Sequence, residues 1–177
     1  MVFLDIDGVL LPFPNPSLDE VHPLFPRHTM EALQVLWDHT TSTCNNGTVE
    51  WILSSTWRVQ PSYIRQIEEA LQAFGIPLSF GDITDPTLHS ERQWEIYEWL
   101  QAQDCLSTTK TVSSSPSDVV WLALDDEELV HGDVNEEHRA LFAGHAVRTE
   151  SHLGLTLEDA RRAIQLWDAQ ISVNKVT

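Results

Sequence analysis

The chain opens with Met1-Val2-Phe3-Leu4-Asp5-Ile6-Asp7-Gly8-Val9-Leu10, its most informative stretch. The apolar run at positions 2–4 shows no polar alternation, which predicts a short strand buried on both faces of a sheet. Two carboxylates, Asp5 and Asp7, follow the run, and Gly8 follows them. Ionised carboxylates are costly to bury unless a cation or another partner neutralises them. The stretch therefore predicts a metal-assisted site at the end of the first strand.

The composition indicates a soluble globular protein with a proper core. The chain has 177 residues, 42% of them hydrophobic, and seven tryptophans, so we expect one domain over residues 1–177. The net charge of −17 repels phosphate polymers and disfavours an extended nucleic-acid footprint. No apolar run is long enough to span a membrane, and the N-terminus lacks a basic leader. The isolated Cys44 and Cys105 are expected to be reduced, so we expect a cytoplasmic protein.

Apolar runs alternate with helix-period patterns along the rest of the chain. Further strands are expected at 49–53, 78–80, 119–124 and 146–148. Helices are expected at 29–39, 61–74, 90–103, 136–142 and onward from Thr156. A proline-rich flap at 11–27, a polar loop at 40–47 and a serine-rich surface loop at 107–117 separate them. This alternation predicts an α/β fold that is Rossmann-like, with a mainly parallel sheet, helices on both faces and minimal or no cap.

Polar pairs follow three of the predicted strands. These pairs are Asp5 and Asp7, Ser54 and Ser55, and Asp125 and Asp126. Because ligands bind parallel sheets beyond the carboxyl ends of the strands, we expect the three pairs to converge on one crevice. Carboxylates that accept a hard cation together with phosphate oxygens indicate Mg²⁺ as the cofactor.

These motifs resemble the haloacid dehalogenase (HAD) superfamily of phosphohydrolases. The first motif is Asp5-Ile6-Asp7-Gly8, the second is Trp51-Ile52-Leu53-Ser54-Ser55, and the fourth is Trp121-Leu122-Ala123-Leu124-Asp125-Asp126. More narrowly, four pieces resemble the HAD domain associated with predicted RNA-repair proteins. They are Ser54 to Arg58, Arg92 to Leu100, Asp125-Asp126, and Gly154-Leu155-Thr156.

The resemblance implies a role for each acidic residue. Asp5 would attack phosphorus and bind Mg²⁺. Asp7 would bind the metal through its backbone carbonyl and act as general acid and then as general base. Asp125, together with Asp126, would complete the metal site.

The residues that contact phosphate are less closely defined. Either Ser54 or Ser55 would bond the phosphoryl group, and Ser54 is favoured because it directly follows the apolar run. The superfamily usually places a lysine here, but the first 103 residues contain none. Arg92 is the expected substitute and Arg58 is its rival. Trp57 is a candidate for the mouth of the crevice.

We therefore expect a Mg²⁺-dependent phosphomonoester hydrolase that forms an aspartyl-phosphate. The short intervals between motifs leave no room for a full cap domain. An open cleft suits a large phosphorylated substrate such as a nucleic-acid terminus. A nucleotidase or a phosphatase of small metabolites is the alternative within catalysis. A non-catalytic phosphate- or Mg²⁺-binding module is the alternative from another class.

Overall fold

Five parallel strands form the centre of the protein in a computed structural model. The model describes residues 1–13, 24–44, 48–85, 91–103, 105, 119–131 and 136–174. The strands are β1 (Val2–Leu4), β2 (Trp51–Leu53), β3 (Asp82–Ile83), β4 (Leu122–Asp125) and β5 (Ala146–Arg148). Their order in the sheet is β3-β2-β1-β4-β5. The chain moves outward from β1 to β3 and then returns to the other side of β1, so the order reverses between β1 and β4. Such a reversal opens a crevice at the carboxyl ends of the strands.

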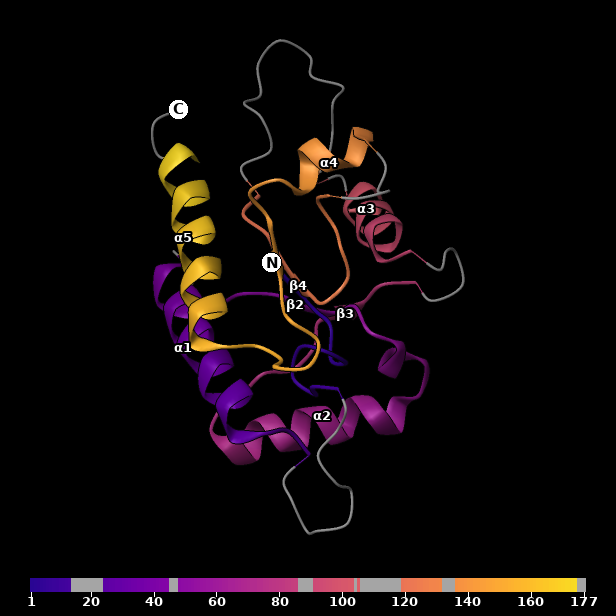
Figure 1. The fold of residues 1–177 in the computed structure, drawn as a ribbon, viewed down its shortest axis with the longest axis vertical. Helices are drawn as coiled ribbons and strands as arrows, with labels where there is room; N and C mark the ends of the chain where they lie inside the picture. Colours follow the sequence, from indigo (N-terminus) through magenta and orange to yellow (C-terminus); the bar gives the residue numbers. More distant parts are fainter. Residues whose placement is uncertain are drawn as a thin grey trace.

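Helices cover both faces of this sheet, as the sequence predicts (Figure 1). The elements are α1 (Arg27–Thr43), the 3₁₀ helix η1 (Thr56–Val59), α2 (Pro61–Phe74), α3 (Arg92–Ala102), α4 (Glu136–Phe142) and α5 (Leu157–Asn174). Val2 and Leu4 pack into a core with α1, α2 and α5, whereas Phe3 packs into a second core with α3 and α4. The unbroken apolar run of β1 therefore serves two cores, because alternate side chains of a strand point to opposite faces. Among the described helices, none has both the length and the apolar character needed to cross a lipid bilayer.

Elements with strong local signals form where the sequence predicts them. The bounds of β1, α2, α4 and β5 agree with the predicted ranges. Pro61 occupies the first turn of α2, where a missing backbone N–H costs nothing. Gly75 ends this helix with φ +102°, a left-handed conformation that favours glycine.

The polar loop predicted at 40–47 is wrong over its first four residues, which continue α1 to Thr43. The hydroxyls of Thr41 and Thr43 donate to the carbonyls of Trp37 and His39, four residues earlier. Trp167 of α5 donates to Thr43 Oγ1 at 3.0 Å. Packing against α5 thus extends a helix whose local sequence favours a loop. Residues 45–47 lie outside the described residues.

The strand predicted at 78–80 is also wrong, because the ladder forms at β3, a few residues later. The amides of Gly81 and Thr84 donate to the carbonyls of Trp51 and Leu53, which sets the register of β3 against β2. Leu78 is buried without joining the ladder. Leu78 and Phe80 thus pack in or against the core, and the more polar residues that follow them pair with β2.

Several further boundaries shift by a few residues. Helix α1 begins at Arg27, two residues earlier than predicted. The second and fourth strands begin at Trp51 and Leu122, later than predicted, and β4 includes Asp125. Helix α3 begins at Arg92 with Glu91 as its N-cap, and Ser90 lies outside the described residues. Most of the predicted flap (14–23) and all of the serine-rich loop (107–117) also lie outside them.

Gly154 supports the loop that follows β1. It has φ +68°, and a Cβ atom there would lie 2.7 Å from the carbonyl oxygen of Val9. The next amide, that of Leu155, donates to this same carbonyl at 2.7 Å. The segment Gly154-Leu155-Thr156 therefore holds the loop next to the acidic residues in place.

We expect Gly154→Ala to lower the free energy of unfolding by about 2–4 kcal/mol, since it combines a strained φ with a backbone clash. The matched control is Gly144→Ala. Gly144 has φ +85°, and nothing lies within 4 Å of a Cβ built there. The free energy of unfolding of the control should fall by only about 1–2 kcal/mol, the cost of placing alanine in the left-handed conformation. Urea titration of both variants measures the difference, and equal losses would contradict the assigned contact.

Candidate active site

Three carboxylates meet in the crevice where the strand order reverses. Asp5 directly follows β1, and its amide donates to the carbonyl of Leu124 at 3.0 Å. Asp125 ends β4 and is 1% exposed. One carboxylate oxygen from each of Asp5, Asp125 and Asp126 lies within 4.8 Å of the others. Parallel pairing of β1 with β4 thus brings together acidic residues about 120 positions apart.

Gly8 allows Asp126 to reach this cluster. Its φ of +72° is left-handed, and a Cβ atom at this position would overlap the Asp126 carboxylate. Thr149 Oγ1, which is buried, donates to the carbonyl of Gly8 at 2.8 Å and holds the turn. The glycine of the first motif is thus needed for both its conformation and its missing side chain.

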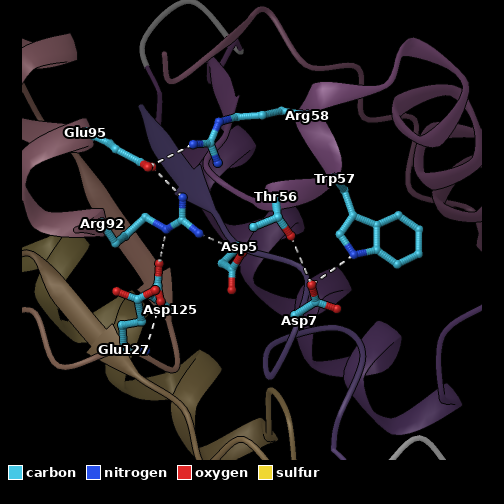
Figure 2. A network of polar contacts seen from close by, with 9 residues as sticks. All are labelled: Asp5, Asp7, Thr56, Trp57, Arg58, Arg92, Glu95, Asp125 and Glu127. Atoms are coloured by element: carbon cyan, nitrogen blue, oxygen red, sulfur yellow. Dashed lines mark hydrogen bonds and ion pairs between the residues drawn. The ribbon is translucent and has the colours of Figure 1, made fainter. Parts of the chain in front are cut away.

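Arg92 offsets the charge of the cluster from the first turn of α3. Its Nε donates to Asp125 at 3.0 Å, Nη1 to Glu95 at 2.6 Å and Nη2 to Asp5 at 3.4 Å (Figure 2). Burial acts to lower the pKa of Arg92, but the carboxylates of Asp125, Asp5 and Glu95 outweigh it and raise that pKa. Each guanidinium nitrogen of Arg92 therefore already contacts a carboxylate.

Arg58, from the 3₁₀ helix after β2, has donors to spare. Its Nη2 pairs with Glu95 at 2.9 Å, so Glu95 bridges the two arginines (Figure 2). Arg58 is 5% exposed, yet its Nε and Nη1 contact no acceptor in the described part of the chain. Burial lowers its pKa, and the nearby positive charge of Arg92 adds to this effect. A buried guanidinium with unused donors suits an anionic ligand.

The two serines after β2 add further unused hydroxyls. Ser54 and Ser55 are both buried, and neither Oγ has a hydrogen-bond partner among the residues described. The Ser54 amide donates to the carbonyl of Leu4, which places the serines beside the end of β1. Ser55 lies close enough to the Asp5 carboxylate to lower its pKa, although its hydroxyl completes no hydrogen bond in this orientation.

Asp7 lies apart from the acidic cluster. Its Oδ2 accepts hydrogen bonds from Trp57 Nε1 at 3.1 Å and Thr56 Oγ1 at 3.3 Å (Figure 2). It is half-buried. Asp5 and Asp7 therefore have different surroundings although they are two positions apart.

The charge balance of the cluster favours a divalent cation. The carboxylates are those of Asp5, Glu95, Asp125 and Asp126, and the guanidinium groups are those of Arg58 and Arg92. When all are ionised, the carboxylates outnumber the cations by two. Carboxylate oxygens are hard ligands that suit Mg²⁺, so the residues present fit this ion.

Burial raises the pKa of Asp5 from 3.8 to about 7, against the opposing effect of Arg92, and the charge of Asp126 raises it further. Burial and the neighbouring Asp5 also raise the pKa of Asp125 well above its usual value. A bound cation would favour the ionised forms of both carboxylates.

We expect Asp5→Asn to become more stable relative to wild type as the pH rises. Between its usual pKa of 3.8 and about 7, Asp5 keeps a proton when folded that it releases when unfolded. Raising the pH through this window therefore lowers the stability of the wild type. In chelator, the variant should gain about 2 kcal/mol relative to wild type between about pH 5 and about pH 8.

Urea unfolding at the two pH values measures this gain. Asp38→Asn is the matched control, because Asp38 lies on α1, outside the acidic cluster. A constant difference between Asp5→Asn and wild type across the window would contradict the shifted pKa.

The structure thus brings Asp5, Asp125 and Asp126 together with Arg92, and Glu95 joins Arg58 to Arg92. Ser54 and Ser55 lie beside the end of β1, and Asp7 lies apart from the acidic cluster. Two residues of the site, Glu95 and Thr56, were not predicted from the sequence. Glu95 follows Arg92 by three helical positions, a spacing that brings side chains together and could have revealed the pair. No comparable local signal marks Thr56.

Comparison with known proteins gives one match. A family model described as the HAD domain in Swiss Army Knife RNA repair proteins matches residues 1–160. The matched range runs from β1 into α5 and includes every residue of the crevice. Neither the curated proteins nor the solved structures yield a match.

Proposed function

Because the chain belongs to the family of HAD domains in Swiss Army Knife RNA repair proteins, we propose that it is a Mg²⁺-dependent phosphomonoester hydrolase. One observation carries the proposal. Asp5 belongs to a group of acidic residues that suit a cation. Ser54, Ser55 and Arg58, which follow the adjacent strand β2, keep buried donors without a partner in the described part of the chain. A phosphoryl group would satisfy those donors while a cation balances the carboxylates.

In the first step, Asp5 attacks phosphorus. One carboxylate oxygen forms a bond to phosphorus while the bond from phosphorus to the ester oxygen breaks. The leaving oxygen takes a proton from Asp7. This transfer requires that the acid lie beside the leaving group. The products of this step are an aspartyl-phosphate on Asp5 and a free alcohol.

In the second step, water attacks the aspartyl-phosphate. Asp7 is now ionised and accepts a proton from the water as the new oxygen–phosphorus bond forms. The bond between Asp5 and phosphorus breaks, releasing inorganic phosphate and restoring both side chains. Trp57 and Thr56, which donate to Asp7, hold this acid–base group in orientation.

Asp5, Asp125 and Asp126 would hold the cation. When bound, Mg²⁺ supplies positive charge that offsets the charge on the phosphoryl oxygens. That the backbone carbonyl of Asp7 also binds the metal stays a prediction from the family resemblance.

The two arginines divide the electrostatic work. Arg92 donates to three carboxylates and so orders the acidic residues. Arg58 keeps Nε and Nη1 unused, so we assign to it the contact with the phosphoryl oxygens that the sequence suggested for Arg92. Glu95 holds both guanidinium groups in place.

We expect turnover of p-nitrophenyl phosphate with Mg²⁺ and none in chelator. Asp5→Asn should abolish turnover because it removes the nucleophile. Asp7→Asn should lower kcat by about 10²–10⁴-fold because it removes the general acid. Asp38→Asn is the control and should match wild type. Undiminished turnover in Asp5→Asn, or in chelator, would contradict the mechanism.

The two arginines should give different results on phosphate binding. Arg58→Gln should weaken the binding of inorganic phosphate about 10- to 100-fold, because it removes charged donors. Arg92→Gln should instead lower stability in chelator, because it leaves buried carboxylates unpaired, and Mg²⁺ should restore much of that loss. Titration calorimetry with phosphate and thermal unfolding with and without Mg²⁺ measure these effects.

Arg58→Lys retains the charge and tests whether the guanidinium fork itself is needed. A larger loss of phosphate affinity in Mg²⁺-loaded Arg92→Gln than in Arg58→Gln would reverse the assignment.

A further inference from the structure

We propose that Trp57 and Tyr63 form an aromatic subsite that stacks the base of a nucleoside phosphate. The inference rests on the proposed function, because it uses Asp7 as the acid that protonates the leaving group. It adds the chemistry of that leaving group, which the phosphate-binding residues leave undefined.

Asp7 locates the leaving group beside Trp57. The acid must lie within hydrogen-bond reach of the ester oxygen that it protonates. Its Oδ2 accepts from Trp57 Nε1 at 3.1 Å, and the indole lies on the far side of Asp7 from Asp5 (Figure 2). The alcohol released from phosphorus therefore leaves on the side of the site where the indole stands.

Tyr63 continues this aromatic surface outward. Its ring centroid lies 5.4 Å from that of Trp57, with 55° between the planes. Tyr63 is 38% exposed, and Val59, the last residue of the 3₁₀ helix that contains Trp57, is 59% exposed. Solvent-facing apolar groups beside a catalytic acid suit a ligand that covers them. Aromatic side chains stack nucleobases, and such stacking tolerates any base because every base has a π-face.

The spacing favours a base carried on a sugar. A ring bonded directly to the ester oxygen would lie against Trp57, next to Asp7. The Tyr63 ring adds a second aromatic surface 5.4 Å from the indole, which a base separated from the phosphate by ribose would cover.

The charge of the chain limits the contact to one nucleotide. A net charge of −17 repels a long run of phosphates, whereas stacking on neutral rings needs no positive charge. A free mononucleotide and the terminal nucleotide of an oligoribonucleotide share this chemistry. The subsite thus binds a single base next to the scissile phosphate.

Adenosine 5′-monophosphate and ribose 5-phosphate test the subsite, because they differ only in the base. With Mg²⁺, wild type should show a kcat/KM roughly tenfold or more higher for the nucleotide. Tyr63→Leu should bring this ratio close to one, mainly through KM, and Tyr63→Phe should keep it because the ring remains. Tyr97→Leu is the matched control. The Tyr97 ring stacks on His138, so the ratio should stay at the wild-type value.

Equal kcat/KM values for the two substrates in wild type, or a ratio unaffected by Tyr63→Leu, would overturn the subsite while leaving the hydrolase standing. A marked preference for phosphotyrosine over the nucleotide would also overturn it.

Calorimetric binding of adenosine 5′-monophosphate and ribose 5-phosphate tests the subsite if the protein shows no turnover. Base-dependent binding that Tyr63→Leu removes would then support the subsite and overturn the proposed hydrolase. Binding without base dependence would overturn both. Assays with 3′- and 5′-phosphorylated oligoribonucleotides, compared with the mononucleotide, identify the source of the base. Either source supports the subsite, and the substrate with the higher kcat/KM is the preferred one.

Discussion

Burial of acidic groups at the end of β1 is the constraint on which the rest of the site depends. Asp5 and Asp125 lie almost completely buried at adjacent strand ends, where their mutual repulsion and loss of water are costly. Arg92 offsets this cost with one donor to each, and its third donor goes to Glu95. The excess of negative charge that remains is what a divalent cation would balance. Structural stability and cation binding are therefore linked in the same few side chains.

The topology of the sheet creates this constraint. The chain places β1 at the centre and reverses its direction of growth between β1 and β4, the position at which open parallel sheets bind ligands. The left-handed turn at Gly8 then lets Asp126 approach, and Gly154 holds the loop from the other side. Small residues at two positions distant in the sequence thus shape the space in which charged residues meet.

Glu95 gives the site two distinct cationic centres. It pairs with both Arg58 and Arg92, which keeps two guanidinium groups close despite their repulsion. One of them is occupied by carboxylates and the other retains unused donors. We propose that this division replaces the single lysine that is usual in the superfamily. Asp7, two positions after Asp5, accepts a hydrogen bond from the indole N–H of Trp57, so the proposed acid–base group lies next to an aromatic side chain.

Features with local causes could be predicted from the amino-acid sequence. The apolar run of β1, Pro61 and Gly75 at the ends of α2, and the acidic pairs after predicted strands needed no partner to be recognised. Other features depend on contacts between elements that are distant in the chain. The end of α1 depends on Trp167, and the place of β3 depends on the ladder offered by β2. The difference between Arg58 and Arg92 depends on which carboxylates surround each one. These three features arise from contacts between residues far apart in the chain. The local sequence pattern around one residue carries no information about its distant partner.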